Sequence, residues 1–306
     1  MEKFDKYLIH ENANVREALV QLDKLAADAT LFVISEDRKL IGSITDGDVR
    51  RALIEGKDAQ ASVMDVINKT PKFIRKGENA LRKLIEFRSK NILIIPVLEK
   101  DNDVISNVIN LRLHRSYLPI DAVIMAGGKG QRLRPLTETT PKPLLKVGDT
   151  PIIERNIDRL GIYGIDDINI SVNYLGEQLE SYFGDGSHKG LNINYVWEDS
   201  PLGTIGAVSK IQEFQNDYIL VMNSDLLTNI DFESFFMDFL EADADLSILS
   251  IPYTVDVPYA VLETDNQRII SLKEKPRYTY YSNGGIYLMK KEVLARIPKG
   301  EFFNAT

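Results

Sequence analysis

Residues Met125-Ala-Gly-Gly-Lys-Gly-Gln-Arg-Leu-Arg-Pro-Leu-Thr-Glu-Thr-Thr-Pro-Lys-Pro-Leu-Leu-Lys146 form a glycine-rich, basic segment directly after the apolar run Asp121-Ala-Val-Ile-Met125. The segment carries five Lys or Arg side chains, and its one acidic residue is Glu138. Glycines allow backbone N–H groups to approach an anion closely, and guanidinium and ammonium groups neutralise the anion's charge. A strand followed by such a turn predicts a loop that holds phosphate groups.

Strand-like and helix-like segments alternate from Ile120 onward. The periodicity predicts strands at 120–125, 168–173, 192–197, 218–223 and 246–251, and helices at 151–160, 177–183, 206–211 and 232–241. This order indicates an α/β fold, a Rossmann-like and mostly parallel doubly wound sheet. Ligands of such sheets bind at the carboxyl ends of the strands, where the glycine-rich loop and Asn223-Ser-Asp225 both fall.

The preceding segment, 1–118, contains two imperfect copies of one pattern. The first copy predicts a helix at 14–25, strands at 30–35 and 40–45, and a helix from Asp46; the second predicts a helix at 79–87, strands at 91–97 and 104–109, and a closing helix. A unit this small buries little surface alone, so we expect the copies to pair. Pro119 disfavours a continuing helix, and we therefore predict two domains, 1–118 and 119–306.

Composition excludes several kinds of site. The chain of 306 residues has no cysteine, which removes disulfides, thiol nucleophiles and Cys-ligated zinc. Its three histidines are far apart in the sequence, which disfavours a His metal cluster or catalytic triad. No apolar run approaches the roughly 18–20 residues of a membrane span, and the first residues lack a signal peptide's apolar region. We expect a cytoplasmic protein with no membrane partner.

Charge is unevenly distributed along the chain. Residues 1–118 carry a net charge of about +2 and the remainder about −10, so the basic segment at 129–146 stands out locally. A nucleic-acid surface requires basic residues spread over a face, which this pattern does not provide. The expected ligand is a small phosphorylated molecule.

Two common phosphate motifs do not fit the glycine-rich segment. A Walker loop needs Ser or Thr after Gly-Lys, and a dinucleotide fingerprint needs a third glycine where Leu133 stands. The string Gly127-Gly-x-Gly-x-Arg-Leu-x-Pro-Leu-Thr137 with Pro141-Lys-Pro143 instead resembles the sugar-1-phosphate nucleotidyltransferase family, and the resemblance covers nearly all of 119–306. It implies that a nucleoside triphosphate (NTP) and a sugar 1-phosphate give an NDP-sugar and pyrophosphate.

The resemblance also implies roles for individual residues. Arg132 would clamp the triphosphate, Lys142 would contact the phosphates nearer the reacting centre, and Asp225 would bind Mg²⁺. The implied nucleotide contacts are Ala126, Gly127, Gly128, Gly130, Glu198, Gly203 and Thr204; the implied sugar-site residues are Glu274, Lys275, Asn283 and Gly284. Simpler interpretations remain open: Asp225 as a cap, Lys275 as an exposed loop residue, and Asn283-Gly-Gly285 as a turn.

The residue inventory agrees with this chemistry independently. The nucleophile is a phosphate oxygen that is already ionised near neutral pH, because the second pKa of a phosphomonoester is about 6. No general base is then required, and catalysis depends on alignment and charge neutralisation.

Glu198 is the candidate for reading the base. A carboxylate only accepts hydrogen bonds, which suits the adjacent N1–H and 2-amino donors of guanine, so we predict GTP; dTTP and UTP remain alternatives. The order of a repeat before a transferase resembles bacterial guanylyltransferases of surface-glycan and nonulosonic-acid pathways. The other interpretation of Glu198 is contact with solvent or a cation.

The repeat resembles a tandem cystathionine-β-synthase (CBS) module, most closely at Leu40-Ile-Gly-Ser-Ile-Thr-Asp-Gly-Asp-Val-Arg-Arg-Ala-Leu53. The resemblance implies that Thr45 and Asp48 contact an adenine nucleotide and that the protein is a homo-oligomer. The alternative is that Thr45 and Asp46 cap the following helix. The second copy departs from the pattern, with Ser106, Ile109 and Arg112 at the matching positions.

Two other function classes remain open. Related chains continue into a Trp-x-Asp-x-Gly stretch with a second metal-binding Asp, and this sequence ends before it, so we expect a C-terminally incomplete domain. A nucleotide-binding sensor without turnover is therefore one alternative. A glycosyltransferase is the other, although Asp225-Leu-Leu227 lacks the usual Asp-x-Asp pair.

Overall fold

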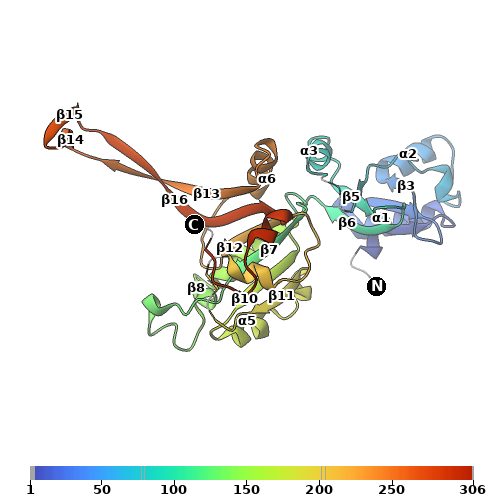
Figure 1. Cartoon of the computed structure of the whole chain (residues 1–306). Helices are drawn as coiled ribbons and strands as arrows, with labels where there is room; N and C mark the ends of the chain where they lie inside the picture. Colours follow the sequence, from blue (N-terminus) through green and yellow to red (C-terminus); the bar gives the residue numbers. More distant parts are fainter. Residues whose placement is uncertain (1–3, 77, 79, 201, 204, 305–306) are drawn as a thin grey trace. The chain divides into compact units, whose positions relative to one another are not determined.

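The computed structural model describes residues 4–76, 78, 80–200, 202–203 and 205–304 (Figure 1). The chain divides into two compact units, Met1–Pro119 with Asp158–Ile165, and Ile120–Ile157 with Asp166–Thr306. The division differs from the predicted domains in grouping 158–165 with the first unit. Within the described residues, no helix is both long and apolar enough to cross a membrane.

The first unit contains the same three-stranded sheet twice. In each sheet the first strand is parallel to the second and the second is antiparallel to the third. The strands are β1 (Leu8–His10), β2 (Thr30–Ile34) and β3 (Leu40–Thr45), then β4 (Ile74–Arg75), β5 (Ile94–Leu98) and β6 (Ile105–Asn110). The predicted internal repeat is therefore confirmed.

Three α-helices flank these sheets: α1 (Val15–Leu25), α2 (Asp46–Ile54) and α3 (Leu81–Ser89). Asn14 caps α1 in a capping box with Glu17, and Thr45 caps α2 in the same way with Asp48. Reciprocal hydrogen bonds of this kind satisfy free N–H groups at a helix start. Short 3-10 turns η1 (Asp5–Tyr7), η2 (Ala26–Asp28) and η3 (Val63–Asp65) complete the described elements.

The two copies pair through a shared core, as expected. Tyr7 and Phe32 of the first copy pack in one cluster with Ile94 and Val108 of the second. The expected closing helix of the second copy is wrong, because 111–119 is not helical. The side chain of Asn110 accepts a hydrogen bond from the backbone N–H of Arg112 at 2.9 Å, which turns the chain instead.

The second unit is built on a six-stranded sheet in the order β11-β10-β7-β12-β16-β13. Central β7 (Ile120–Met125) is parallel to β10 (Asp167–Val172) and β12 (Tyr218–Asn223), and β10 is parallel to β11 (Asn192–Trp197). The exception is β16 (Arg277–Lys290), which is antiparallel to both β12 and β13 (Leu246–Asp256). The predicted mostly parallel α/β sheet is confirmed.

Both faces of the central strands are covered. Val123 and Val221 pack on one face with Ile205 and Val208, whereas Ala122 and Leu220, which alternate with them, are also fully buried. The helices are α4 (Ile152–Ile162), α5 (Gly176–Phe183) and α6 (Phe232–Glu241). The predicted helix at 206–211 is instead the 3-10 turn η7 (Gly206–Lys210), whose start lacks a side-chain cap.

The remaining described elements of this unit are short. They are η4 (Gln131–Leu133), η5 (Lys142–Leu144), β8 (Lys146–Val147), β9 (Thr150–Pro151), η6 (Ser187–Lys189), β14 (Val261–Asp265), β15 (Arg268–Lys273) and η8 (Lys291–Arg296). Strands β13 and β16 continue beyond the sheet as a long two-stranded ribbon that carries β14 and β15 at its outer end (Figure 1).

Candidate functional site

The glycine-rich loop follows β7 and is held in place by its neighbours. The backbone N–H of Ala126 donates to the carbonyl of Ser171 at the end of β10, at 2.9 Å. Gly130 has a left-handed φ of 60°, and the hydroxyl of Thr137 donates to its carbonyl at 2.9 Å. A Cβ at Gly130 would lie 2.9 Å from the Thr137 side chain, so a glycine is required there.

Gly130→Ala is expected to lower the free energy of unfolding by about 2 kcal/mol, through left-handed strain and crowding. Gly128→Ala is the matched control, because a Cβ at Gly128 would meet nothing within 4 Å. Chemical denaturation of both variants measures the difference. Equal stabilities would contradict the tight packing of the loop.

Lys142 and Asp225 meet at the carboxyl edge of the sheet. The ammonium of Lys142, at the start of η5, donates a hydrogen bond to a carboxylate oxygen of Asp225, which lies two residues beyond β12. Both side chains are about one-third exposed. The N–H of Ser224 donates to the Met125 carbonyl at 3.2 Å, and a Cβ at Gly130 would lie 3.1 Å from Lys142 Cβ. The structure thus brings the loop, Lys142 and Asp225 together.

The donor set at Asp225 fits Mg²⁺ in one specific way. Mg²⁺ in nucleotide sites is held by one or two carboxylates together with substrate phosphates. Among the described residues there is no group of three acidic, His or Cys side chains that would hold a metal ion without substrate. One partly exposed carboxylate beside a phosphate loop therefore suits an ion that arrives with the nucleotide.

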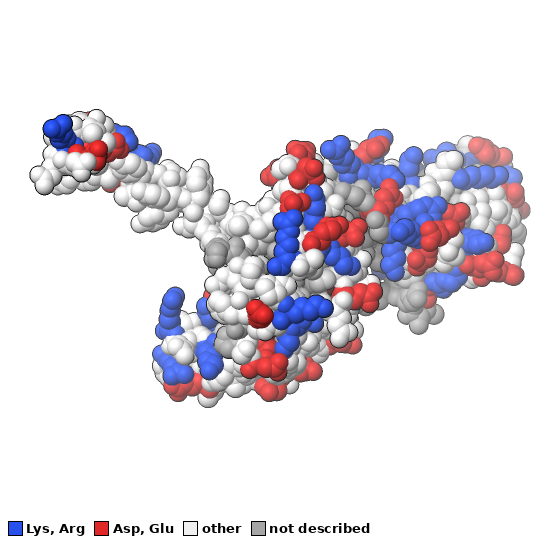
Figure 2. Space-filling view, in the orientation of Figure 1, with Lys and Arg blue, Asp and Glu red and all other residues white. Residues whose placement is uncertain are grey.

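Arg132 lies in η4, directly after the glycine-rich loop, and its side chain is exposed. Lys129 and Arg134 flank it in the sequence and are also exposed. Figure 2 shows several blue side chains over this loop region at the lower left, as expected for a surface that attracts a polyphosphate.

Glu198 follows β11 and is buried, with 9% of its surface exposed. Its carboxylate accepts hydrogen bonds from the Ser171 hydroxyl and, at 3.0 Å, from the N–H of Leu202. A Cβ at Gly127 would lie 2.8 Å from its Oε1. Glu198 therefore joins β10, the glycine-rich loop and the turn after β11. Sequence reasoning missed Ser171, because its contact depends on the register of β10 and β11.

The predicted base loop borders the last described residues. Phe303 N donates to the Leu202 carbonyl at 3.0 Å, and Ile205 N donates to the Phe303 carbonyl at 3.2 Å. Gly203 has a φ of 79°, and a Cβ there would lie 2.6 Å from that same carbonyl. Thr204, also predicted in this loop, lies outside the described residues. Nothing in the sequence motif indicated that 303–304 would pack here.

The predicted sugar-site residues separate into two places. Gly285 lies against Asn223 near Asp225, and the preceding Asn283 side chain donates to the Tyr287 hydroxyl at 2.8 Å and accepts from Gly285 N–H at 2.8 Å. Asn283 and Gly284 thus lie within strand β16, at a register shift in its pairing with β13, just before the glycine that lies against Asn223. Glu274 and Lys275 do not: they follow β15 at the outer end of the ribbon, which Figure 1 shows far from β8 and the loop before it.

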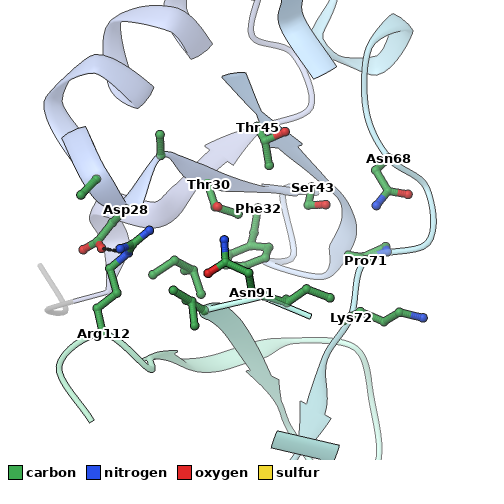
Figure 3. Close-up of a pocket in the computed structure, with 15 residues that line it drawn as sticks. Asp28, Thr30, Phe32, Ser43, Thr45, Asn68, Pro71, Lys72, Asn91 and Arg112 are labelled. Carbon is green, nitrogen blue, oxygen red and sulfur yellow. Dashed lines mark ion pairs between the residues drawn. The ribbon is translucent and has the colours of Figure 1, made fainter. Parts of the chain in front are cut away.

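The first unit contains a separate pocket of about 350 Å³ between its two sheets (Figure 3). Thr45, Asn68 and Lys72 lie on one side of it, and Arg112 pairs with Asp28 on the other, with 3.5 Å between charged atoms. The volume is within the range of small-ligand sites. Its lining includes Thr45 but not Asp48, whose carboxylate accepts hydrogen bonds from Thr45 and Arg51.

Comparison with known families agrees with this geometry. The Nucleotidyl transferase family model matches residues 121–302, and a CBS domain model matches 5–55. The chain belongs to the nucleotidyl transferase family. The glycine-rich loop, Lys142 and Asp225 all fall within the region matched by the family, and the first copy of the repeat is a CBS domain.

Three curated relatives show the range of the family. Mannose-1-phosphate guanylyltransferase of Mycobacterium tuberculosis is 34% identical over 186 residues, covering 59% of this chain and 52% of the relative. UTP–glucose-1-phosphate uridylyltransferase of Synechocystis is 34% identical over 202 residues, covering 60% and 52%. D-glycero-α-D-manno-heptose 1-phosphate guanylyltransferase of Aneurinibacillus thermoaerophilus is 32% identical over 176 residues, covering 57% and 76%. The chain spans about half the length of the first two relatives.

Proposed function

We propose that this chain transfers a nucleoside monophosphate from an NTP to a sugar 1-phosphate and releases pyrophosphate. The observation that carries the proposal is the pairing of Lys142 with Asp225 beneath the glycine-rich loop. An oxygen of the sugar phosphate forms a bond to the α-phosphorus, and the bond from that phosphorus to the α,β-bridging oxygen breaks. Pyrophosphate leaves with the electron pair.

The residues of the site align and neutralise the reacting phosphates. Backbone N–H groups of the loop and Arg132 would hold the triphosphate, and Lys142 would donate to the phosphate under attack. Asp225 would hold Mg²⁺, which neutralises phosphate charge when it is bound. In the free protein the Lys142–Asp225 pair keeps both groups at the position where the phosphates arrive.

GTP is the proposed nucleotide. A carboxylate has about four acceptor positions, and Glu198 uses one on each oxygen, so acceptor positions remain for the two donors of guanine. Guanylyl- and uridylyltransferases are equally similar to the chain, so the similarity alone does not favour one base. From the domain order alone, a repeat before a transferase, we propose that the product is a precursor for surface-glycan or nonulosonic-acid synthesis.

The test is a matrix of GTP, UTP, dTTP, ATP and CTP against glucose, mannose, glucosamine and N-acetylglucosamine 1-phosphates, read as pyrophosphate release with Mg²⁺. We expect turnover with at least one sugar phosphate and a preference for GTP. NTP binding without pyrophosphate release in any combination would favour the sensor alternative and contradict the proposal. Equal rates with UTP or dTTP would contradict the assignment of GTP.

The pocket of the first unit supports a second function, the binding of a regulatory adenine nucleotide. Lys72 and Arg112 supply positive charge for phosphate, and Thr45 and Asn68 supply polar groups. Because Arg112 is paired with Asp28, a bound phosphate would have to compete with that carboxylate.

Thr45→Val and Arg112→Ala are each expected to weaken adenine-nucleotide binding at least tenfold by calorimetry. Thr45→Val should also lower the free energy of unfolding by about 1 kcal/mol, because it removes the cap of α2. Asp48→Ala tests whether Asp48 contacts the ribose or only forms the capping box with Thr45. Unchanged affinity would contradict a ribose contact by Asp48. Unchanged affinity in all three variants would contradict binding in this pocket.

A further inference from the structure

Helix α4 carries one polar residue on its buried stripe. Ile153, Ile157 and Leu160 recur at helical spacing and are fully buried. Asn156 lies on the same stripe, three residues after Ile153, and only 3% of its surface is exposed. An aliphatic side chain is the residue type that such a stripe favours. A buried amide loses its hydrogen bonds to water, so it is tolerated only with a specific partner.

The partner of the Asn156 amide is the chain that leads to Asp225. The Nδ2 atom of Asn156 donates to the backbone carbonyl of Ser224 at 3.3 Å, and both residues are buried. The pairing of β12 with β7 ends at Asn223 and Met125, so Ser224 lies just beyond the regular hydrogen bonds of the sheet. A buried carbonyl at such a place needs a donor from another segment. Asn156 supplies one.

The bond fixes the peptide group that precedes Asp225. The Ser224 carbonyl belongs to the planar peptide between Ser224 and Asp225, and the orientation of that plane sets the direction in which the Asp225 side chain leaves the backbone. The N–H of Ser224 is held as well, since it donates to the Met125 carbonyl at 3.2 Å. Asp225 therefore follows a residue whose N–H and carbonyl both have partners.

The same helix holds the segment that carries Lys142. The backbone N–H of Ile152, at the start of α4, donates to the Leu145 carbonyl at 3.1 Å, three residues after Lys142. Ile152 and Asn156 are four residues apart, so they lie on the same side of α4, about one turn from each other. A single turn of helix thus contacts the chain beside both partners of the Lys142–Asp225 ion pair.

We propose that Asn156 is a positioning residue of the transfer site, which holds the Asp225 carboxylate in the orientation that Mg²⁺ and Lys142 require; this rests on the proposed function. Asn156 touches neither substrate nor metal in this role and acts only through the Ser224 carbonyl. Mg²⁺ accepts little departure from octahedral geometry, so its affinity is sensitive to the direction of a carboxylate ligand. Removing a residue that orients a metal ligand typically lowers metal affinity or activity by about 10- to 100-fold.

Asn156→Leu tests the role, because it removes the amide donor and introduces the residue type that the stripe favours. We expect the Mg²⁺ concentration for half-maximal pyrophosphate release to rise by about tenfold or more, since the Asp225 carboxylate is no longer held. Binding of GTP in EDTA, measured by calorimetry, should match wild type, whereas binding of GTP with Mg²⁺ should weaken. A general loss of structure would weaken both.

Ile157→Val is the matched control. Ile157 is fully buried on the same stripe and adjacent to Asn156 in the chain, so the change loosens the packing of α4 without removing a hydrogen bond. Its Mg²⁺ requirement should equal that of wild type even if its thermal stability falls. Asn156→Ala, which also lacks the donor, replaces Asn156→Leu if the leucine variant does not fold.

The outcomes separate this proposal from the proposed function. If wild type is active and the Asn156→Leu variant keeps the wild-type Mg²⁺ requirement, the positioning role is overturned, whether or not kcat falls. If wild type binds GTP but releases no pyrophosphate, the proposed function is contradicted instead. Calorimetry then decides the role of Asn156: equal strengthening of GTP binding by Mg²⁺ in wild type and variant overturns it, and a smaller strengthening in the variant supports it.

Discussion

Asp225→Asn is expected to lower kcat/KM for nucleotidyl transfer by about 100- to 1,000-fold, with little change in thermal stability. The substitution removes the charge that would hold Mg²⁺ and that pairs with the Lys142 ammonium, while it keeps the side chain's size. Pyrophosphate release over a range of Mg²⁺ concentrations measures the effect, and the Mg²⁺ requirement should rise.

The matched control is Asp243→Asn. Asp243 also pairs with a lysine, Lys290, but is 93% exposed and lies after α6 rather than at the site. Its activity should remain within about twofold of wild type, because an exposed ion pair contributes little. If the Asp225→Asn variant were as active as this control, Asp225 would have no role in nucleotidyl transfer.

Glu198→Ala is expected to lower the free energy of unfolding by about 2–4 kcal/mol and to reduce turnover with every NTP. The change leaves the buried N–H of Leu202 and the hydroxyl of Ser171 without their acceptor. It also opens space beside Gly127, so the turn after β11 should lose its position. Denaturation and pyrophosphate release together measure the loss.

Glu198→Gln separates base recognition from positioning. The amide keeps one carbonyl oxygen as an acceptor but replaces the other oxygen with an NH₂ donor, which is unsuited to the donors of guanine. We expect kcat/KM to fall at least tenfold more with GTP than with UTP. An equal fall with both nucleotides would make Glu198 a positioning residue and leave base selection to other groups.

The sequence predicted the parallel part of the sheet well. Strands β7 and β12 are largely apolar runs, and β10 and β11 alternate polar with apolar residues, which is also typical of strands. The sequence also predicted the proximity of the glycine-rich loop to Asp225, since both follow parallel strands. It did not predict the closing turn after Asn110, where one side-chain hydrogen bond replaces a helix. Nor did it predict η7, a five-residue 3-10 turn in place of the expected helix.

The remaining features of the site depend on contacts between distant segments. The bond from Ser171 to Glu198 requires the register of two neighbouring strands, and the packing of Phe303 on the base loop joins residues about 100 positions apart. The place of Lys275 in the fold could not be predicted for the same reason. A motif identifies what Glu274-Lys-Pro276 resembles, but only the direction of β13 and β16 shows where it lies.

The most direct test is a crystal structure of the chain with GTP and Mg²⁺. We expect triphosphate density against the backbone of 127–130, with Lys142 turned from Asp225 to a phosphate and the ion on the Asp225 carboxylate. A nucleotide bound elsewhere, or a loop left empty at saturating GTP and Mg²⁺, would contradict it.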